Sequence, residues 1–213
     1  YMVQKMEEIT YRDLVKEEYP RLERLIGETW GFGRRCKDKK VAGLLEKAYW
    51  ASLLSQADFA RAALINGRPV GVVLAKREGK GGKNFAMIFR GIFYKLRLAV
   101  NAEGRGNLKI FRELNQQNRR MFKEQGEKFD GELIYLNIMR NKKGKGLGSQ
   151  LWEDAKNYIQ NSGGKNFFFF TDTTCDYKFY EKKGCQRIAA SEKILDMGGQ
   201  RKHLEMYIYK YEM

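Results

Sequence analysis

The sequence is poor in the residues that build metal sites and disulfide frameworks. Among its 213 residues are one histidine, three cysteines and two prolines. A single imidazole excludes a multi-histidine metal site. The cysteines, Cys36, Cys175 and Cys185, are odd in number and match no zinc-ligand spacing. We therefore expect no bound metal, three free thiols and a cytoplasmic location, where thiols stay reduced.

Long apolar runs are also missing. The longest one is far too short to cross a bilayer, so the sequence predicts no membrane span. Hydrophobic residues nevertheless make up 43% of the chain and aromatic residues 13%, which argues against disorder and for one packed domain. The formal charge is +15. Such a surface attracts nucleic acid, acidic lipid or a phosphorylated ligand, although simple solubility explains the charge equally well.

The hydrophobic pattern predicts a mixed series of helices and strands. Asn66-Gly67, the dipeptide best suited to a tight turn, marks a hairpin. Thr10 with Asp13 resembles a capping box, Pro20 suits the restart of a helix, and Asp38 suits another cap. The strands are expected at residues 3–9, Phe59–Ile65, Val70–Ala75, Glu132–Ile138, Lys165–Thr171, 185–195 and 202–211, and the helices after residues 10, 20 and 38, at 84–98, at 106–125, from Leu147 to Gly163 and at 175–183, with a last turn at Gly198-Gly199.

Residues 79–129 stand apart from this series, and we interpret them as a helical insertion within one domain spanning 1–213. Gly79-Lys80-Gly81-Gly82 breaks the pattern and permits hinging. A basic, aromatic stripe follows on one helical face, made of Phe85, Ile88, Phe89, Ile92, Phe93 and Leu96. Such a stripe can lie on a membrane surface, but it more often packs in the core or covers a site. We expect a core or lid position.

A glycine-rich loop between a predicted strand and a predicted helix indicates a phosphate ligand. In Gly144-Lys145-Gly146-Leu147-Gly148-Ser149, the glycines let the chain turn sharply and let a ligand approach the backbone. The helix that follows presents unpaired N–H groups and the positive end of its dipole. Lys142 and Lys143 add charge. The order of residues fits neither the Walker pattern nor the Rossmann pattern.

The same loop resembles the pyrophosphate motif Gln/Arg-x-x-Gly-x-Gly/Ala of the GNAT superfamily of acyl-CoA-dependent N-acyltransferases. Lys143 stands where this family usually has arginine or glutamine, and its point charge still suits a phosphate. A second segment, Phe179-Tyr180-Glu181-Lys182-Lys183-Gly184, resembles the family's Phe/Leu-Tyr-Glu-Lys-x-Gly-Phe, with Cys185 in place of the last Phe. The resemblance covers most of the chain outside residues 79–129.

The resemblance implies a fold and a cofactor. The fold is α/β, with a mixed, twisted central sheet, splayed middle strands and helices on both faces. The splayed strands would be Glu132–Ile138 and Lys165–Thr171, and the pantetheine arm of acetyl-CoA would lie between them. The implied cofactor-binding residues are main chain of the first strand and the loop, namely Leu136, Asn137, Ile138, Lys143, Gly144, Lys145, Gly146, Leu147, Gly148 and Ser149.

The resemblance also implies direct transfer of the acetyl group to a primary amine, with no metal. Tyr180 matches the family tyrosine that protonates the leaving thiolate or hydrogen-bonds its sulfur, although it could simply pack. Glu132 is the candidate general base, acting directly or through water. Asp172 is a rival base that could instead form a turn with Thr173 and Thr174.

Two other reactive side chains are weaker candidates. His203 is the sole imidazole, but it is more typical of the surface of a strand. Cys175 has no histidine in its sequence context to activate it, so a covalent acyl-enzyme is not expected.

Three function classes remain open at this stage. The first is an N-acetyltransferase with acetyl-CoA and an amine acceptor as partners. The second is a CoA-binding protein that has lost catalysis. The third is a basic module for nucleic acid or anionic surfaces, but the RRM, KH and helix-turn-helix signatures are absent, so nucleic acid is not expected. The chain would act as a monomer or homodimer, with the insertion lining or covering the acceptor side.

Overall fold

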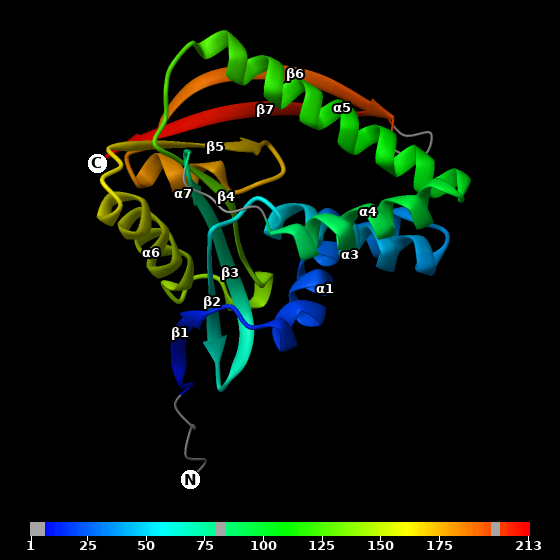
Figure 1. Ribbon diagram of the computed structural model, residues 1–213, viewed down its shortest axis with the longest axis horizontal. Coiled ribbons are helices and arrows are strands. Elements are labelled where there is room, and N and C mark those ends of the chain that lie inside the picture. The colour runs from blue at the N-terminus through cyan, green and yellow to red at the C-terminus, as the bar shows by residue number, and fades with distance from the viewer. Residues whose placement is uncertain (1–6, 80–83, 197–200) are drawn as a thin grey trace.

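The core of the structure is a seven-stranded sheet in the order β1-β2-β3-β4-β5-β7-β6 (Figure 1). This computed structural model describes residues 7–79, 84–196 and 201–213. Neighbouring strands run antiparallel except β4 and β5, which are parallel. The strands are β1 Ile9–Asp13, β2 Phe59–Ile65, β3 Arg68–Arg77, β4 Gly131–Ile138, β5 Asn166–Asp172, β6 Gln186–Asp196 and β7 Arg201–Glu212. The expected α/β fold with a mixed sheet is confirmed.

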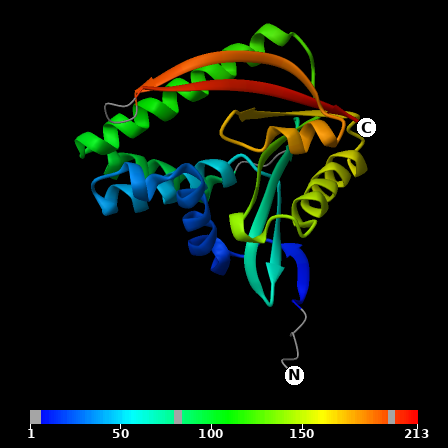
Figure 2. The same ribbon diagram turned by 180° about the vertical axis from the view of Figure 1, so that it is seen from behind.

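Helices cover both faces of this sheet (Figures 1 and 2). They are α1 Tyr19–Trp30, α2 Phe32–Arg35, α3 Lys39–Leu54, α4 Phe85–Ala99, α5 Ala102–Gln125, α6 Leu147–Asn161 and α7 Tyr177–Lys182, with short 3-10 turns at Lys16–Glu18 and Arg140–Lys142. One core packs α1–α3 against the sheet, and a second core packs α6 against the opposite face. Within the described residues, no helix is both long and apolar enough to cross a membrane.

Local sequence signals explain several element boundaries. Asn66 and Gly67 have φ values of 50° and 71°, as the tight turn between β2 and β3 requires. The Asp38 carboxylate accepts a hydrogen bond of 2.8 Å from the backbone N–H of Lys40 and caps α3. Pro20 lies in the first turn of α1, where its missing N–H is tolerated. These three predictions are confirmed.

The start of the chain differs from the expectation. The predicted capping residues Thr10 and Asp13 lie within strand β1, opposite Leu64 and Arg61 of β2. The predicted capping box is therefore wrong, because pairing with β2 outweighs the local tendency to start a helix. Of the strand expected at 3–9, only the part from residue 7 can be compared, and β1 begins at Ile9. The turn predicted at Gly198-Gly199 lies outside the described residues.

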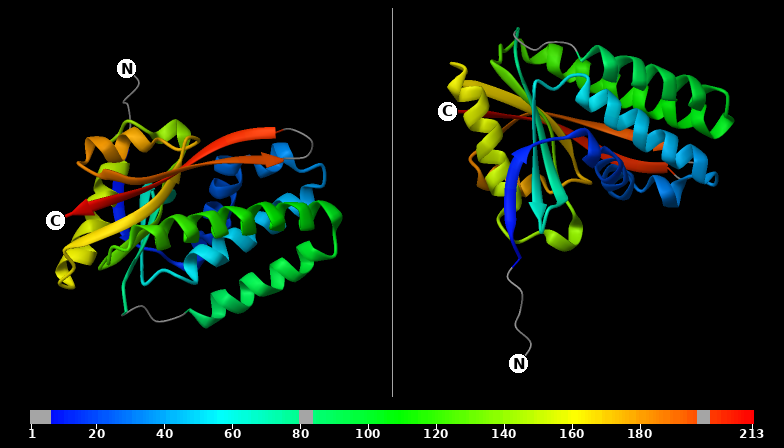
Figure 3. Two further views of the ribbon diagram at one scale, coloured as in Figure 1. Left: turned by 90° about the horizontal axis from the view of Figure 1, so that it is seen from above. Right: turned by 60° about the horizontal axis from the view of Figure 1, so that its bottom comes forward.

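The region between β3 and β4 forms the antiparallel helix pair α4 and α5 (Figure 3). Helix α4 packs on α3 through Met87, Gly91 and Leu98. The aromatic stripe is not buried: Phe85, Phe89, Ile92, Phe93 and Leu96 are exposed and Ile88 is half-buried. Of the two positions expected for it, core or lid, the core position is therefore wrong. The pattern showed an apolar face correctly, but the neighbour that α4 packs on contacts the opposite side.

Helix α5 links two parts of the molecule. Near its start, Leu108 and Phe111 pack on the core of α1–α3. Further along, Leu114, Met121 and Phe122 pack on the side chains of β5, β6 and β7. In Figure 1, α5 accordingly runs from beside α3 to a position over β6 and β7. One helix thus spans both halves of the splayed sheet.

Candidate functional site

A cleft of about 1700 Å³ opens where β4 and β5 separate. These two strands share a single ladder pair, Glu132 with Phe168. Beyond this pair they diverge, which confirms the expected splay. The cleft is walled by β4 and β5, by the loop and first turn of α6, by Tyr180 of α7, and by side chains of α1, α3 and α5.

Among the described residues, the edge of β4 that faces the cleft has no strand partner beyond Glu132. On its other side, β4 pairs with β3, where Leu74 stands opposite Tyr135 and Ala75 opposite Leu133. Ile134 is left unpaired between them, so β4 carries a β-bulge, which bends a strand and increases its local twist. The open edge can pair with an extended ligand backbone, as an added strand would. Leu136, Asn137 and Ile138 all line the cleft at this edge.

The glycine loop leads directly into the first turn of α6. Gly144 and Gly146 have φ values of 84° and 75°, which side chains with a Cβ rarely adopt. Gly146 is the N-cap residue, and no side chain caps the helix. The backbone N–H groups of Leu147, Gly148 and Ser149 therefore remain available, and all three residues line the cleft. An uncapped helix start with no acidic residue in its first turn fits a phosphate group.

The lysines of the loop have different surroundings. The Lys142 ammonium lies 3.0 Å from the carboxylate of Glu7, and the Lys145 ammonium binds the other oxygen of the same group. These contacts lower the pKa of Glu7. Lys143 and Gly144 line the cleft, whereas Lys145 does not. Of the ten residues expected to hold the cofactor, Lys145 alone lies off the cleft wall in this structure.

Tyr180, on α7, lies on the cleft wall beside α6. Its ring packs against Trp152 and Phe169, with ring centroids 5.7 Å and 4.4 Å away. Burial raises the pKa of Tyr180 above its ordinary value of 10.0, so the phenol keeps its proton. Its hydroxyl has no hydrogen-bond partner among the described residues. The hydroxyl of Tyr180 can therefore donate its hydrogen to a ligand in the cleft.

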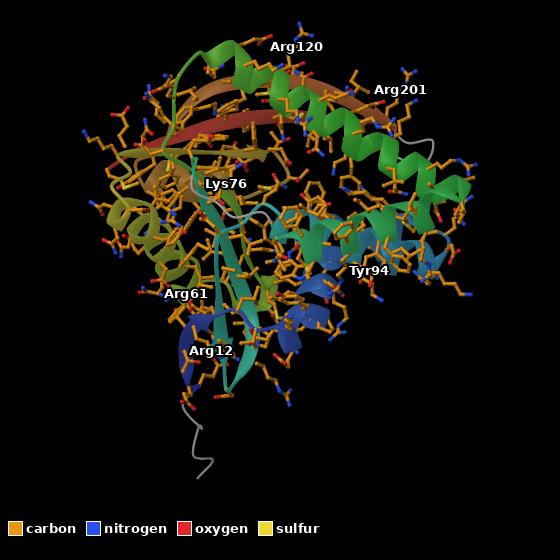
Figure 4. All side chains as sticks on the ribbon, in the orientation of Figure 1. Arg12, Arg61, Lys76, Tyr94, Arg120 and Arg201 are labelled. Carbon is orange, nitrogen blue, oxygen red and sulfur yellow. The ribbon has the colours of Figure 1, made fainter. Side chains whose placement is uncertain are left out.

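Both candidate bases, Glu132 and Asp172, line the cleft. Glu132 lies at the start of β4, 13% exposed, with one oxygen 2.6 Å from the ammonium of Lys76 on β3 (labelled in Figure 4). Asp172 lies at the end of β5, 9% exposed, and accepts a hydrogen bond of 2.7 Å from the backbone N–H of Thr174 as well as one from its hydroxyl. The turn that was the alternative for Asp172 is present.

A polar network that the sequence did not indicate occupies the cleft beside β4. The side-chain amide of Asn137 donates to the hydroxyls of Thr29, at 2.7 Å, and Tyr135, at 2.8 Å. Burial raises the pKa of both Tyr135 and Tyr49. The network joins β4 to the end of α1, and only the tertiary fold brings these residues together.

An aromatic and polar wall continues this part of the cleft. Trp30, Tyr49 and Phe111 contact one another with ring centroids 5.2–6.3 Å apart. Two buried polar atoms at the cleft have no protein partner within the described residues: the indole N–H of Trp30 and the amide oxygen of Asn118. Buried polar atoms are normally hydrogen-bonded. These atoms are available to a ligand.

Cys175 and His203, the two weaker candidates for a reactive side chain, differ in their position relative to the cleft. Cys175 lines the cleft, but desolvation raises the pKa of its thiol, which disfavours the nucleophilic thiolate. His203 lies on β7, about half exposed, 3.1 Å from Glu192 and away from the cleft wall. All three cysteines are free, as expected. In the described part of the chain, no group of three or more histidine, cysteine, aspartate or glutamate residues is placed to hold a metal ion.

The sequence matches no protein-family model and no curated protein. Solved structures do match. An acetyltransferase of the GNAT family from Streptococcus pneumoniae is 14% identical, with a TM-score of 0.53 over 97% of this chain and 100% of that chain. An N-acetyltransferase from Staphylococcus aureus Mu50 is 10% identical, with a TM-score of 0.54 over 96% and 98% of the two chains. The PaiA N-acetyltransferase from Thermoplasma acidophilum, in complex with coenzyme A, is 12% identical, with a TM-score of 0.50 over 97% and 99%.

Proposed function

Since the chain has the fold of the GNAT acetyltransferases, we propose that it transfers the acetyl group of acetyl-CoA directly to a primary amine. The observation that carries this proposal is the meeting, in one cleft, of three features. They are the uncapped start of α6, the unpaired edge of β4 and the free hydroxyl of Tyr180. They suit the pyrophosphate, the pantetheine arm and the thioester sulfur of one extended molecule.

Each part of the cofactor has a matching surface. The N–H groups of the first turn of α6 and the ammonium of Lys143 attract the pyrophosphate. The amides of pantetheine pair with main chain at Leu136–Ile138, because this edge of β4 has no other partner. The same edge supplies a backbone N–H that can stabilise the oxyanion on the thioester carbonyl. Among the structural relatives, the Thermoplasma acidophilum protein was solved with coenzyme A.

The reaction needs one attack and two proton movements. The neutral amine nitrogen attacks the thioester carbonyl carbon, and the C–S bond then breaks with its electrons moving to sulfur. Tyr180 donates to the developing thiolate, a role that suits a phenol that keeps its proton. The attacking nitrogen loses one proton, and we assign its acceptance to Glu132, directly or through water. Asp172 is the rival for this step, and both carboxylates face the cleft.

The acceptor amine enters, in this proposal, on the side of α5. The walls there combine the rings of Trp30, Tyr49 and Phe111 with the unpartnered amide oxygen of Asn118. This lining favours an amine whose body is apolar or aromatic and carries hydrogen-bonding groups. Helix α5, together with α1 and α3, thus sets acceptor choice, whereas the loop sets cofactor affinity.

Two measurements test the proposal. Calorimetry with CoA and acetyl-CoA measures binding, and release of free thiol from acetyl-CoA over a panel of primary amines measures transfer. We expect binding in the absence of any amine and thiol release that depends on one. Absence of CoA binding at millimolar concentration would overturn the central claim. Binding without turnover over a broad panel would instead support a CoA-binding protein that has lost catalysis.

A further inference from the structure

The outer face of α4 is an exposed apolar surface. It consists of Phe85, Phe89, Ile92, Phe93 and Leu96, with Val100 directly after the helix, and their exposed fractions run from 48% to 84%. We call this set the α4 face. Single exposed apolar residues are common on proteins, but six large ones at helical spacing on one face mark an interaction surface.

The protein holds α4 with this face pointing outward. Met87, Gly91 and Leu98, on the opposite side of the helix, pack on α3. Tyr94 (labelled in Figure 4) packs on the same core. The guanidinium of Arg90 reaches the buried carboxylate of Glu23 on α1 at 2.6 Å. Seen from above, α4 lies at the outer edge of the molecule, with α3 and α5 between it and the sheet (Figure 3, left).

The sequence of α4 carries basic residues and no acidic ones. Between Glu78 and Glu103 the sequence contains no acidic residue, but it contains Lys80, Lys83, Arg90, Lys95 and Arg97. On α4, Arg97 lies over the ring of Phe93 at 5.8 Å and is itself exposed. Exposed basic residues continue at one-turn spacing on α5, with Arg105, Lys109 and Arg112. Among the described residues, Arg97 is thus the cation that lies on the α4 face itself, whereas Arg90 pairs inward with Glu23 and Lys95 lines the cleft.

We propose that the α4 face docks on the surface of an anionic lipid bilayer, with the helix lying in the plane of the membrane. A helix with Phe, Leu and Ile on one face and Lys and Arg at its flanks inserts its apolar side at the boundary between headgroups and acyl chains. Its basic flanks then meet lipid phosphates, which attract cations near the membrane. This inference is independent of the acetyl transfer proposed above.

The same charges argue against a second copy of the chain as the occupant. In a symmetric dimer built on this face, Arg97 of each copy would approach the other copy's cations. Helix α4 has no aspartate or glutamate to balance them. The α4 face also lies on the outer side of a helix at the edge of the molecule, where a flat lipid surface can reach it.

Sedimentation with lipid vesicles tests this docking. The full chain is mixed with vesicles of phosphatidylcholine alone or of equimolar phosphatidylcholine and phosphatidylglycerol. We expect pelleting with the anionic vesicles only, weakened by added salt. Replacing two rings together, Phe89→Gln with Phe93→Gln, should lower the partition coefficient by at least about tenfold, because both rings lose their burial in the lipid. Arg97→Glu should lower it as well.

Ile194 provides the matched control, because it is 63% exposed on β6 and outside the α4 face. Ile194→Gln should pellet like the wild type. No binding of the wild type to anionic vesicles would overturn the proposal, and so would equal loss in the Ile194 and double-ring variants. A dimer in sedimentation equilibrium that the double-ring variant dissociates, without vesicle binding by either protein, would assign the face to a second copy. Circular dichroism on each variant checks the fold.

Discussion

The guanidinium of Arg90 lies 2.6 Å from the carboxylate of Glu23 and joins helix α4 to α1. The Glu23 side chain is only 5% exposed. Its burial raises the pKa of the carboxyl group above the ordinary value of 4.5, even though Arg90 favours the charged form. The native protein therefore holds this proton to a higher pH than the unfolded chain does.

This raised pKa predicts how stability depends on pH. Above pH 4.5 the unfolded chain releases the Glu23 proton first, so the contribution of Glu23 to stability is present at lower pH and is lost as pH rises through its raised pKa. Glu23→Gln cannot titrate, so the free energy of unfolding of the wild type minus that of the variant should fall over this range. Urea unfolding at a series of pH values measures it. Glu28→Gln, at an exposed site of the same helix, is the control. If the difference in free energy of unfolding between wild type and variant had the same slope against pH for both variants, the prediction would be contradicted.

Gly104 and Gly106 of α5 should respond oppositely to alanine. A Cβ on Gly104 would lie 2.1 Å from the carbonyl oxygen of Leu98, at the corner between α4 and α5. A Cβ on Gly106 would meet nothing within 4 Å. We expect Gly104→Ala to destabilise by about 1–3 kcal/mol and Gly106→Ala to stabilise by about 0.5–1 kcal/mol. Thermal unfolding of both variants measures these changes in stability. Destabilisation by both would contradict the prediction, because only the Cβ at Gly104 meets the carbonyl oxygen of Leu98.

Much of this fold follows from local patterns, and the exceptions have a common cause. The β2–β3 hairpin, the cap of α3 and helix α6 are encoded within a few neighbouring residues, through Asn66-Gly67, Asp38 and a strong apolar period. Strand β1 was missed at Thr10 and Asp13 because its stability comes from β2, far along the chain. A core position was one of the two expected for the stripe on α4, and it is wrong because a pattern shows that a face is apolar but not what covers it.

The candidate site likewise contains some residues that the sequence reveals and others that it does not. The loop with Gly144 and Gly146 is visible in the sequence because positive φ and close backbone approach require glycine. Thr29, Tyr49 and Asn118 carry no local signal, since each is an ordinary residue of a helix. They reach the cleft only through the packing of α1, α3 and α5. A cofactor motif can thus be found in one segment, whereas an acceptor pocket assembled from several elements cannot.

Gly146 should be necessary for cofactor binding. Gly146→Val puts a side chain at the uncapped start of α6 and strains a φ of 75°. We expect CoA to raise the melting temperature of the wild type through binding to the folded state and to leave that of the variant unchanged. Gly67→Val is the matched control, because Gly67 has a φ of 71° and also meets no atom within 4 Å, in the hairpin turn. Retained CoA binding in Gly146→Val, measured by calorimetry, would remove the loop from the cofactor site.

Tyr180→Phe tests protonation of the leaving group. The ring contacts with Trp152 and Phe169 remain, so the fold and CoA affinity should persist. We expect kcat to fall by roughly a hundredfold, the scale of general acid catalysis, with little change in KM. The rise of the rate with pH should persist, because it reports deprotonation of the amine or its base. Unchanged kcat, with the chemical step shown to limit the rate, would reduce Tyr180 to a packing residue.

Asn118 tests the role of the inserted helices in acceptor choice. Its amide oxygen is buried at the cleft without a protein partner. We expect Asn118→Ala to raise the KM of the best acceptor amine by up to about tenfold, the worth of one hydrogen bond, and to leave CoA affinity unchanged. Gln116→Ala, at an exposed site of the same helix, should change neither. A loss of CoA affinity in the Asn118 variant would place α5 at the cofactor instead.

The path of α5 also determines how the molecule unfolds. The sheet is weakest between β4 and β5, where a single ladder pair joins its two halves. Helix α5 crosses this seam, with Phe111 packed in the core on one side and Phe122 packed against the strands on the other. Neither half can lose its packing without releasing the helix that the other half also needs. The seam is therefore not a boundary between folding units, and heat should melt both halves in one cooperative transition, with equal calorimetric and van't Hoff enthalpies.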